Sequence, residues 1–391
     1  EPPHQLRPEI PAALSDIVLK LMAKSADERY QSTVGLRADL QRCRQQWQAN
    51  GEIEPFPLGQ HDVADRFQIP DKLYGREAET EQLLAAFGRS SAGSSELLLI
   101  AGGSGVGKSR LVNEVQKPIV EHRGYFLSGK FDQFKRNIPF SGLHVAFREL
   151  IRQVMAESPD RVASWREGIN RALGSVGQVI VEVIPELELL AGPQPPVPEL
   201  PSEQSRNRFN QAFRRFVQLF CRPEHPLCIF LDDLQWGDAA TLAWIEDVLA
   251  DRSYGSLLLI GAYRANEVSA SHPLAAMLDR LAVRKSHVTT LLVEPLGQAS
   301  VRQLIAETLS NDPASCSDII DVLFSRTEGN PFHITQLLSA LHEDGVIHFD
   351  HEQRAWRYDI SGVRTSRITD NIVDLLTERL QRLSAEAQSV L

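Results

Sequence analysis

The chain has 391 residues, of which 42% are hydrophobic and 24% charged, a balance typical of globular proteins with room for two or three domains. The net charge of −10 and the lack of a long basic run disfavour a protein whose main role is to bind nucleic acid. The sequence has no apolar run long enough to span a bilayer and no recognisable signal peptide, so we expect a cytoplasmic protein.

The N-terminal part of the sequence predicts helices followed by a linker. Apolar residues recur at helical spacing between 14 and 22 and between 36 and 43, so residues 1–50 are expected to be helical. Residues 51–71 read as a linker, because Pro55, Pro57, Gly59 and Pro70 interrupt any periodicity.

The central part, residues 72–294, is predicted to form an α/β core. The candidate strands are short apolar runs at 97–101, 125–131, 227–232, 257–263 and 288–293. Helical stretches separate several of these runs, which indicates a parallel sheet covered by helices on both faces. A large helical insertion, with a proline-rich loop, is expected at about 133–210 between the second and third strands.

The first candidate strand leads into a phosphate-binding loop of the pattern Gly-x-x-x-x-Gly-Lys-Ser, from Gly102 to Ser109. We expect the glycines to let backbone N–H groups turn toward phosphates, Lys108 to reach the β- and γ-phosphates, and Ser109 to ligate Mg²⁺. A helix starting near Lys108 would point its N-terminal dipole at the same anion. The alternative, a flexible loop that binds nothing, is disfavoured because a strand, the loop and a helix follow in the required order. The predicted nucleotide-binding residues here are Gly102, Gly103, Ser104, Gly105, Val106, Gly107, Lys108, Ser109 and Arg110.

Paired acids, Asp232 and Asp233, end the third candidate strand. A carboxylate at a strand tip beside a phosphate loop is suited to hold Mg²⁺ through its water shell, and we assign Asp232 to that role. Asp233 is expected to orient or deprotonate the attacking water. The alternative for Asp233 is that it only caps the following helix. Trp236 is expected to pack rather than to take part in chemistry.

A third motif, Tyr263-Arg264, ends the fourth candidate strand. Arg264 is expected to lie near the γ-phosphate and to sense its presence. A surface arginine paired with an aspartate or glutamate fits the spacing equally well.

The C-terminal part predicts helices at 295–345, then a hairpin-like pair at 346–349 and 355–358, and a long helix at 370–383. The sequence starts at Glu1 and ends within a predicted helix, so we expect it to be part of a longer polypeptide.

The order of these motifs resembles that of the signal-transduction ATPases with numerous domains (STAND), a branch of the AAA-related P-loop ATPases. Tyr74-Gly-Arg-Glu77 resembles a motif of that family whose arginine, here Arg76, lies near the nucleotide. Gly329-Asn-Pro331 resembles a motif whose proline, here Pro331, packs near the adenine; by itself it indicates only a turn or a helix boundary. The resemblance implies ATP and Mg²⁺ as ligands, a P-loop core at 72–294, a helical lid at 295–345 and the start of a winged-helix domain at 346–391.

Other segments, among them 129–133, 266–268 and 369–371, are similar to one bacterial architecture. In it a serine/threonine kinase, this ATPase, a GAF sensor and a histidine kinase share one polypeptide. Residues 1–50 then resemble the end of a protein kinase C-lobe, without its catalytic motifs, so this chain would not phosphorylate protein by itself. The partners implied are ATP or ADP, those other domains, and a second copy in nucleotide-dependent self-association.

Two functions remain open at this point. One is a slow Mg²⁺-dependent ATPase switch with Lys108, Asp233 and Arg264 as its catalytic residues. The other is a nucleotide-gated scaffold with little or no hydrolysis. This alternative stays open because the sequence identifies no arginine that would act on the nucleotide of a second copy, and Arg280 and Arg284 are candidates only by their position. A DNA-loading ATPase fits poorly with the net charge, and a GTPase is disfavoured because no Asn-Lys-x-Asp motif occurs.

Overall fold

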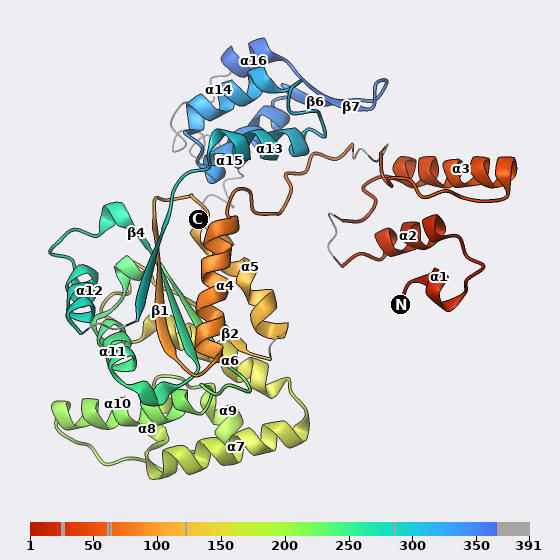
Figure 1. The fold of residues 1–391 in the computed structure, drawn as a ribbon. Coiled ribbons are helices and arrows are strands. Elements are labelled where there is room, and N and C mark those ends of the chain that lie inside the picture. The colour runs from red at the N-terminus through yellow and green to blue at the C-terminus, as the bar shows by residue number, and fades with distance from the viewer. Residues whose placement is uncertain (25–27, 61, 63–64, 122, 285–286, 366–391) are drawn as a thin grey trace, which may run out of the picture. The chain divides into compact units, whose positions relative to one another are not determined.

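The computed structural model describes residues 1–365 apart from 25–27, 61, 63–64, 122 and 285–286. The chain divides into two compact units, Arg76–Glu294 and Glu1–Gly75 with Pro295–Leu391. The first contains a parallel five-stranded sheet in the order β2-β3-β4-β1-β5 (Figure 1). Its strands are β1 (Ser95–Gly102), β2 (Tyr125–Lys130), β3 (Leu227–Asp232), β4 (Leu257–Arg264) and β5 (Val288–Val293). The predicted α/β fold with a parallel sheet is therefore confirmed.

Helices cover both faces of this sheet, which explains why its central strands are mainly apolar. Helices α4 (Glu77–Ser91) and α5 (Lys108–Glu121) pack side by side on one face. Helices α11 (Ala239–Ala250) and α12 (Pro273–Val283) pack together on the other face (Figure 1). Every residue of β1 from Glu96 to Gly102 is consequently buried.

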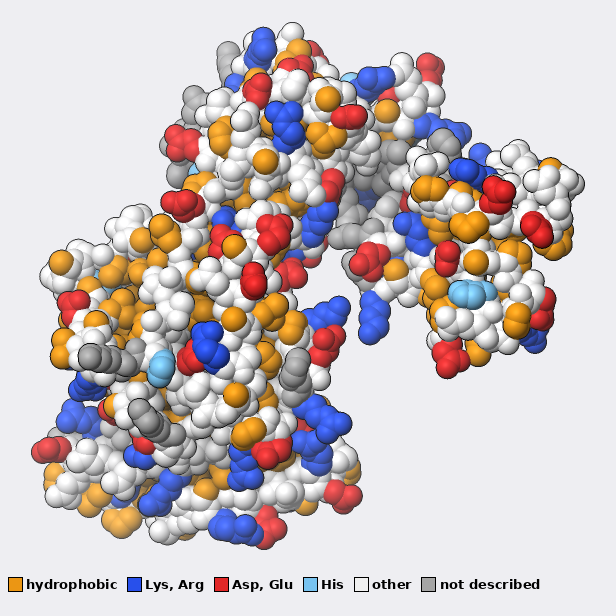
Figure 2. Space-filling view, in the orientation of Figure 1, with side chains coloured by type: hydrophobic (Ala, Val, Ile, Leu, Met, Phe, Trp, Pro, Cys, Tyr) orange, Lys and Arg blue, Asp and Glu red, His pale blue; other side chains and the backbone are white. Residues whose placement is uncertain are grey.

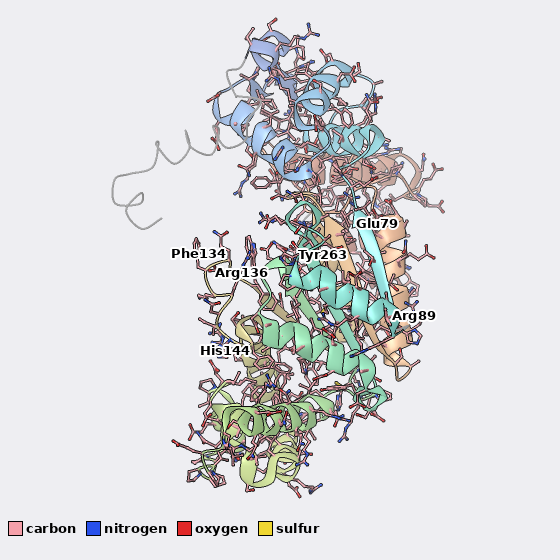
Figure 3. All side chains as sticks on the ribbon, turned by 90° about the vertical axis from the view of Figure 1, so that its left-hand side faces the viewer. Glu79, Arg89, Phe134, Arg136, His144 and Tyr263 are labelled. Carbon is pink, nitrogen blue, oxygen red and sulfur yellow. The ribbon has the colours of Figure 1, made fainter. Side chains whose placement is uncertain are left out.

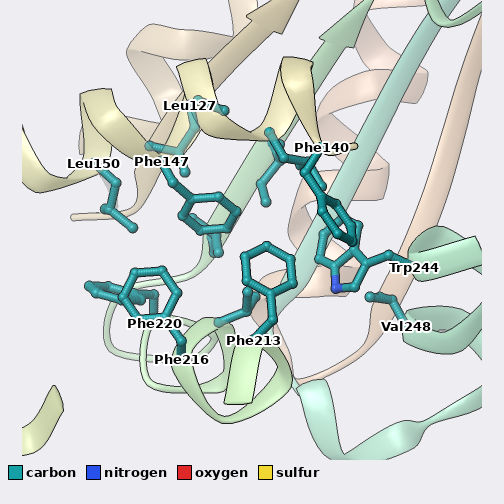
Figure 4. Close-up of a cluster of buried hydrophobic side chains, with 14 of the residues drawn as sticks. Leu127, Phe140, Phe147, Leu150, Phe213, Phe216, Phe220, Trp244 and Val248 are labelled. Carbon is teal, nitrogen blue, oxygen red and sulfur yellow. The ribbon is translucent and has the colours of Figure 1, made fainter. Parts of the chain in front are cut away.

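The segment between β2 and β3 is helical and shares the core of the sheet. Its helices are α6 (Ser141–Met155), α7 (Pro159–Leu173), α8 (Gln178–Val181), α9 (Leu187–Ala191) and α10 (Ser202–Gln218). Phe147 on α6 lies 5.4 Å from Phe213 on α10, whose ring lies 5.6 Å from Trp244 on α11 (Figure 4). These edge-on and tilted ring contacts make the segment part of one continuous core.

The N-terminal residues form helices α1 (Pro3–Leu6), α2 (Ala12–Leu21) and α3 (Thr33–Asn50). The described residues of the segment predicted as a linker form no helix or strand, but part of the segment packs on these helices. Ile53, Phe56 and Leu58 lie against the buried side chains of α2 and α3. The Gly59 amide donates to the carboxylate of the buried Asp39 at 2.7 Å, so this part of the segment is held in place.

Residues 295–365 form α13 (Gln298–Thr308), α14 (Ser317–Thr327), α15 (Pro331–Glu343), the antiparallel pair β6 (Ile347–Asp350) and β7 (Ala355–Tyr358), and α16 (Ile360–Thr365). The predicted helix at 370–383 lies outside the described residues. Within the described part of the chain, no helix combines the length and apolar character needed to cross a membrane.

The residue pair Tyr74-Gly75 is anchored in this C-terminal helical core. Tyr74 is buried, and its hydroxyl donates to Glu307 at 2.9 Å. Burial favours a higher pKa for Glu307, but hydrogen bonds from Lys72, Gln303 and Tyr74 outweigh it and hold the pKa of that carboxyl below its usual value.

Candidate functional site

The carboxyl ends of four neighbouring strands lie level with one another. Lys130 of β2 is in register with Asp232 of β3, and Arg264 of β4 is in register with Gly102 of β1. Residues far apart in the sequence thus come together at one edge of the sheet, the edge at which open parallel sheets bind ligands.

The segment after β1 has the conformation that its glycines predict. Gly105 and Gly107 have φ angles of +75° and +95°, which residues other than glycine rarely adopt. A Cβ on Gly102 would lie 2.5 Å from the Val293 carbonyl oxygen. Helix α5 then begins at Lys108 and buries Val112 on the sheet, so the predicted strand, loop and helix are all present.

Lys108 is enclosed by the loop that it follows. The side chain is 9% exposed, and Nζ donates to the carbonyl oxygens of Gly102 at 3.1 Å and Gly103 at 2.6 Å. Burial lowers the pKa of Lys108 and the nearby Arg264 lowers it further, while Asp232 acts in the opposite direction. An anion bound in the loop would supply countercharge to this desolvated ammonium group.

The two predicted magnesium ligands are in contact. Ser109 Oγ donates to Asp232 Oδ2 at 2.9 Å, and Asp232 Oδ1 accepts from the Asp233 amide at 2.9 Å. A hydroxyl and a carboxylate oxygen suit Mg²⁺, which takes few protein ligands and completes its shell with water and phosphate oxygens. Among the described residues no cluster of three or more His, Cys, Asp or Glu could hold a metal ion.

Asp233 is buried, in a strained backbone conformation, and does not cap the following helix. Its φ is +53°, and its side chain makes no capping hydrogen bond to η2 (Leu234–Trp236). The capping alternative is therefore wrong. Its oxygens instead face Gln235 Nε2 at 3.0 Å, Lys130 Nζ at 3.3 Å and Arg264 Nε at 3.5 Å.

Arg264 pairs with acidic side chains, as the alternative of a surface arginine in an ion pair predicts. One of these partners is Asp233, the predicted catalytic acid. Arg264 Nη1 is 2.9 Å from Glu267 Oε1, and its guanidinium carbon lies 5.1 Å from the centre of the Trp236 ring. Trp236 packs against the core, as expected. Contact with a γ-phosphate stays a prediction for Arg264.

Arg76 is buried against the phosphate loop. Its Nη2 donates to the Val106 carbonyl at 3.3 Å and to the Glu294 carbonyl, and its Nη1 pairs with Glu79 at 3.1 Å. Arg110, the last predicted residue of the loop, is partly exposed with Nε 3.9 Å from Glu114.

The remaining predicted residues have local structural roles. Pro331 is the first residue of α15, and the Asn330 side chain caps that helix by accepting from the Phe332 amide at 3.1 Å. The motif thus forms a helix boundary, and its place near an adenine stays a prediction. Arg280 pairs with Glu246 through both Nε and Nη2, which favours the surface alternative for it.

Two polar residues of the site, Lys130 and Gln235, were given no role by sequence reasoning. Lys130 is the last residue of β2, and Gln235 follows Asp233 by two positions, so nearness to a strand end is the sequence signal that could have identified both.

Beyond Lys130 the chain forms a loop from which Phe134, 86% exposed, and Arg136 project at the same end of the sheet as Tyr263 (Figure 3). Lys and Arg side chains are mixed with Asp and Glu over the face shown in Figure 2.

The strand order and the loop define the fold of P-loop nucleotide-binding proteins. Residues 72–260 match the family model described as the AAA ATPase domain. Among solved structures, the chain is similar to the Aeropyrum pernix ORC2 protein, with a TM-score of 0.44 and 17% identity over 82% of this chain and 74% of that one. That likeness is low, and the fold assignment rests on the strand order and the loop.

Two curated relatives are histidine kinases. The hybrid signal transduction histidine kinase G of Dictyostelium discoideum is 28% identical over 99% of this chain and 13% of its own length. The peroxide stress-activated histidine kinase mak3 of Schizosaccharomyces pombe is 19% identical over 92% of this chain and 18% of its own length. The chain therefore spans less than a fifth of either relative.

Proposed function

We propose that this chain is an ATP-binding module that hydrolyses ATP with Mg²⁺ and acts as a conformational switch in a multidomain signalling protein. The observation that carries the proposal is the 2.9 Å contact between Ser109 Oγ and Asp232 Oδ2, beside the buried ammonium of Lys108. The match to the AAA ATPase domain and the relatedness to histidine kinases support it.

Nucleotide binding follows from the charge of the loop. Lys108 would exchange the carbonyl oxygens of Gly102 and Gly103 for phosphate oxygens, which gives its ammonium group a true countercharge. The amino end of α5 adds a favourable dipole for the same anion. Ser109 and Asp232 would hold Mg²⁺, which when bound neutralises charge on the β- and γ-phosphates.

Hydrolysis requires one group to direct water at the γ-phosphorus. In the proposed reaction Asp233 orients the water and accepts its proton while the water oxygen bonds to phosphorus. The bond between that phosphorus and the bridging oxygen of ADP breaks, so ADP and inorganic phosphate leave. Arg264 would stabilise charge on the transferred group.

A second function, the nucleotide-gated scaffold, is favoured by one observation. Both oxygens of Asp233 already have partners, with Gln235 and Arg264 on Oδ1 and Lys130 on Oδ2. A carboxylate engaged in this way is a poor base until Lys130 moves, so turnover in the isolated chain would be slow.

The wider protein is part of the proposal. We propose that residues 1–50 are the end of a kinase domain, that 295–345 form the lid, and that 346–391 begin a winged-helix domain of the STAND type. Further domains of the polypeptide would include a GAF sensor and a histidine kinase, and a second copy would associate when nucleotide binds. A bacterial origin and a cytoplasmic location stay predictions.

The first experiment is steady-state ATP hydrolysis with Mg²⁺ over a range of protein concentrations. The variants are Lys108→Ala and Asp233→Asn, and Lys117→Ala, an exposed lysine on the same helix, is the control. We expect turnover that is lost with Lys108→Ala and Asp233→Asn, retained with Lys117→Ala, and increased at high protein concentration. Tight ATP binding without turnover at any concentration would refute the ATPase and favour the scaffold.

A further inference from the structure

A buried carboxamide joins the ends of β3 and β4. Gln235 is 2% exposed and uses both atoms of its amide group. Its Nε2 donates to Asp233 Oδ1 at 3.0 Å, and its Oε1 accepts from the Arg264 backbone amide at 3.1 Å. One side chain thus contacts two of the residues that are proposed to act on the γ-phosphoryl group, Asp233 and Arg264.

The chemistry of its neighbours fixes the orientation of this amide. A carboxylate can only accept and a backbone N–H can only donate, so Gln235 must present its nitrogen to Asp233 and its oxygen to Arg264. The reversed amide would create two repulsive contacts in a buried place. The Gln235 amide can therefore join the two strand ends in only one of its two orientations.

The two oxygens of Asp233 have different surroundings. Oδ1 faces the buried Gln235 amide and Arg264 Nε, whereas Oδ2 faces Lys130 Nζ. The Lys130 side chain is 67% exposed, while that of Asp233 is 9% exposed. An exposed lysine can move into solvent at little cost, but a buried amide with both hydrogen bonds made cannot. The contact on Oδ1 is fixed and the contact on Oδ2 is exchangeable.

We propose that Gln235 is a positioning residue for ATP hydrolysis. It holds Asp233 by Oδ1, so that Oδ2 is the oxygen offered to water once Lys130 has left, and it ties the Arg264 backbone to that orientation. This inference rests on the proposed ATPase function. Gln235 acts through Asp233 and touches neither the nucleotide nor the water.

Two substitutions separate positioning from packing. Gln235→Glu has nearly the same shape and keeps an acceptor for the Arg264 amide, but it turns an oxygen toward Asp233 Oδ1. Gln235→Met keeps the length and removes both hydrogen bonds. For each we expect kcat to fall at least about tenfold, with the Kd values for MgATP and MgADP changed by less than about threefold.

The matched control is Gln153→Glu on α6. Gln153 is a partly buried glutamine whose Nε2 donates to the Phe126 carbonyl at 3.3 Å, near the amino end of β2 and therefore away from the carboxyl ends of the strands. We expect it to keep the kcat of the parent. The double variant Asp233→Asn with Gln235→Glu exchanges amide and carboxylate, so that the hydrogen bond can form again. We expect it to recover the melting temperature lost in Gln235→Glu but not the turnover.

The outcomes distinguish the two proposals. A parent chain without turnover would overturn the ATPase and, with it, the positioning role. A parent that turns over, beside Gln235→Glu and Gln235→Met with the same kcat, would overturn the positioning role alone. Nucleotide affinity that falls in parallel with kcat would also overturn it, because the residue would then only maintain the shape of the site. Turnover restored in the double variant would show that Asp233 does not direct the water.

Discussion

Replacing Lys108 with alanine is expected to remove most of the thermal stabilisation that ATP gives to the Arg76–Glu294 unit. The substitution deletes a buried ammonium group that donates to two carbonyl oxygens of the loop. Without nucleotide, the loss of these bonds is offset because a desolvated charge is also removed, so the melting temperature of the free protein should change little. With nucleotide, the charge-assisted contact to phosphate has no replacement.

The size of the effect can be worked out from that contact. One charge-assisted hydrogen bond to phosphate contributes about 3 kcal/mol, which is roughly 140-fold in affinity. At an ATP concentration of about 1,000 times the parent Kd, the parent gains about 4 kcal/mol of stability and the variant about 1.2 kcal/mol. For a unit of roughly 200 residues this corresponds to shifts in melting temperature of about 8–16 °C for the parent and about 2–5 °C for the variant.

The assay is thermal unfolding with and without MgATP for the parent, Lys108→Ala and Lys117→Ala. The Lys117 variant tests for a general effect of removing a positive charge from α5, because this lysine is exposed on the same helix. We expect it to match the parent. An ATP-dependent shift in Lys108→Ala as large as that of the parent would refute the placement of phosphate at this loop.

Three further predictions concern the metal pair, the buried arginine and an ion-paired glutamate. The double variant Ser109→Ala with Asp232→Asn removes the proposed magnesium ligands, so its affinity for ATP should not depend on Mg²⁺. Calorimetry with Mg²⁺ and with a chelator measures this affinity. Arg76→Ala should lower the free energy of unfolding by about 2–4 kcal/mol, because it leaves two carbonyls and the Glu79 carboxylate without their donor. Urea unfolding measures this change, and Arg152→Ala, an exposed site on α6, should change stability by less than about 0.5 kcal/mol. Glu307 has a lowered pKa in the folded chain, so its contribution to stability is complete above its unfolded pKa of about 4.3 and is lost as the pH falls through the folded value. Glu307→Gln should therefore flatten the acid side of a plot of melting temperature against pH.

Each of these expectations has a result that contradicts it. ATP affinity that still depends on Mg²⁺ in the double variant would place the metal elsewhere. Equal urea midpoints for Arg76→Ala and Arg152→Ala would mean that the buried arginine does not hold the loop. If the melting temperatures of the parent and of Glu307→Gln fall in the same way toward acid pH, the partners of Glu307 contribute nothing to the stability of the fold.

The sheet could be predicted from the sequence because each strand is a short apolar run between polar or glycine-rich segments. The phosphate loop could be predicted because the glycines of a tight anion-binding turn have a fixed spacing. The contacts of Gln235 and Lys130 depend instead on which strands lie side by side. Parallel strands are joined by long crossovers, so their lateral order is not written in local periodicity. The packing of Ile53 and Phe56 on the N-terminal helices escaped prediction because prolines and glycines mark irregular backbone, whether or not it is packed.

The strand order also determines when the phosphate loop can form during synthesis. The neighbours of β1 are β4 and β5, which begin at Leu257 and Val288, whereas β1 ends at Gly102. At about 5–20 residues per second, the ribosome needs on the order of ten seconds to supply β4 after β1 has emerged. During that interval β1 is an apolar segment with no strand to pair with, a state that favours aggregation and calls for chaperones. The chain therefore completes its nucleotide site near the end of the folding of this unit, and ATP present at that moment would bind the native state and favour its completion.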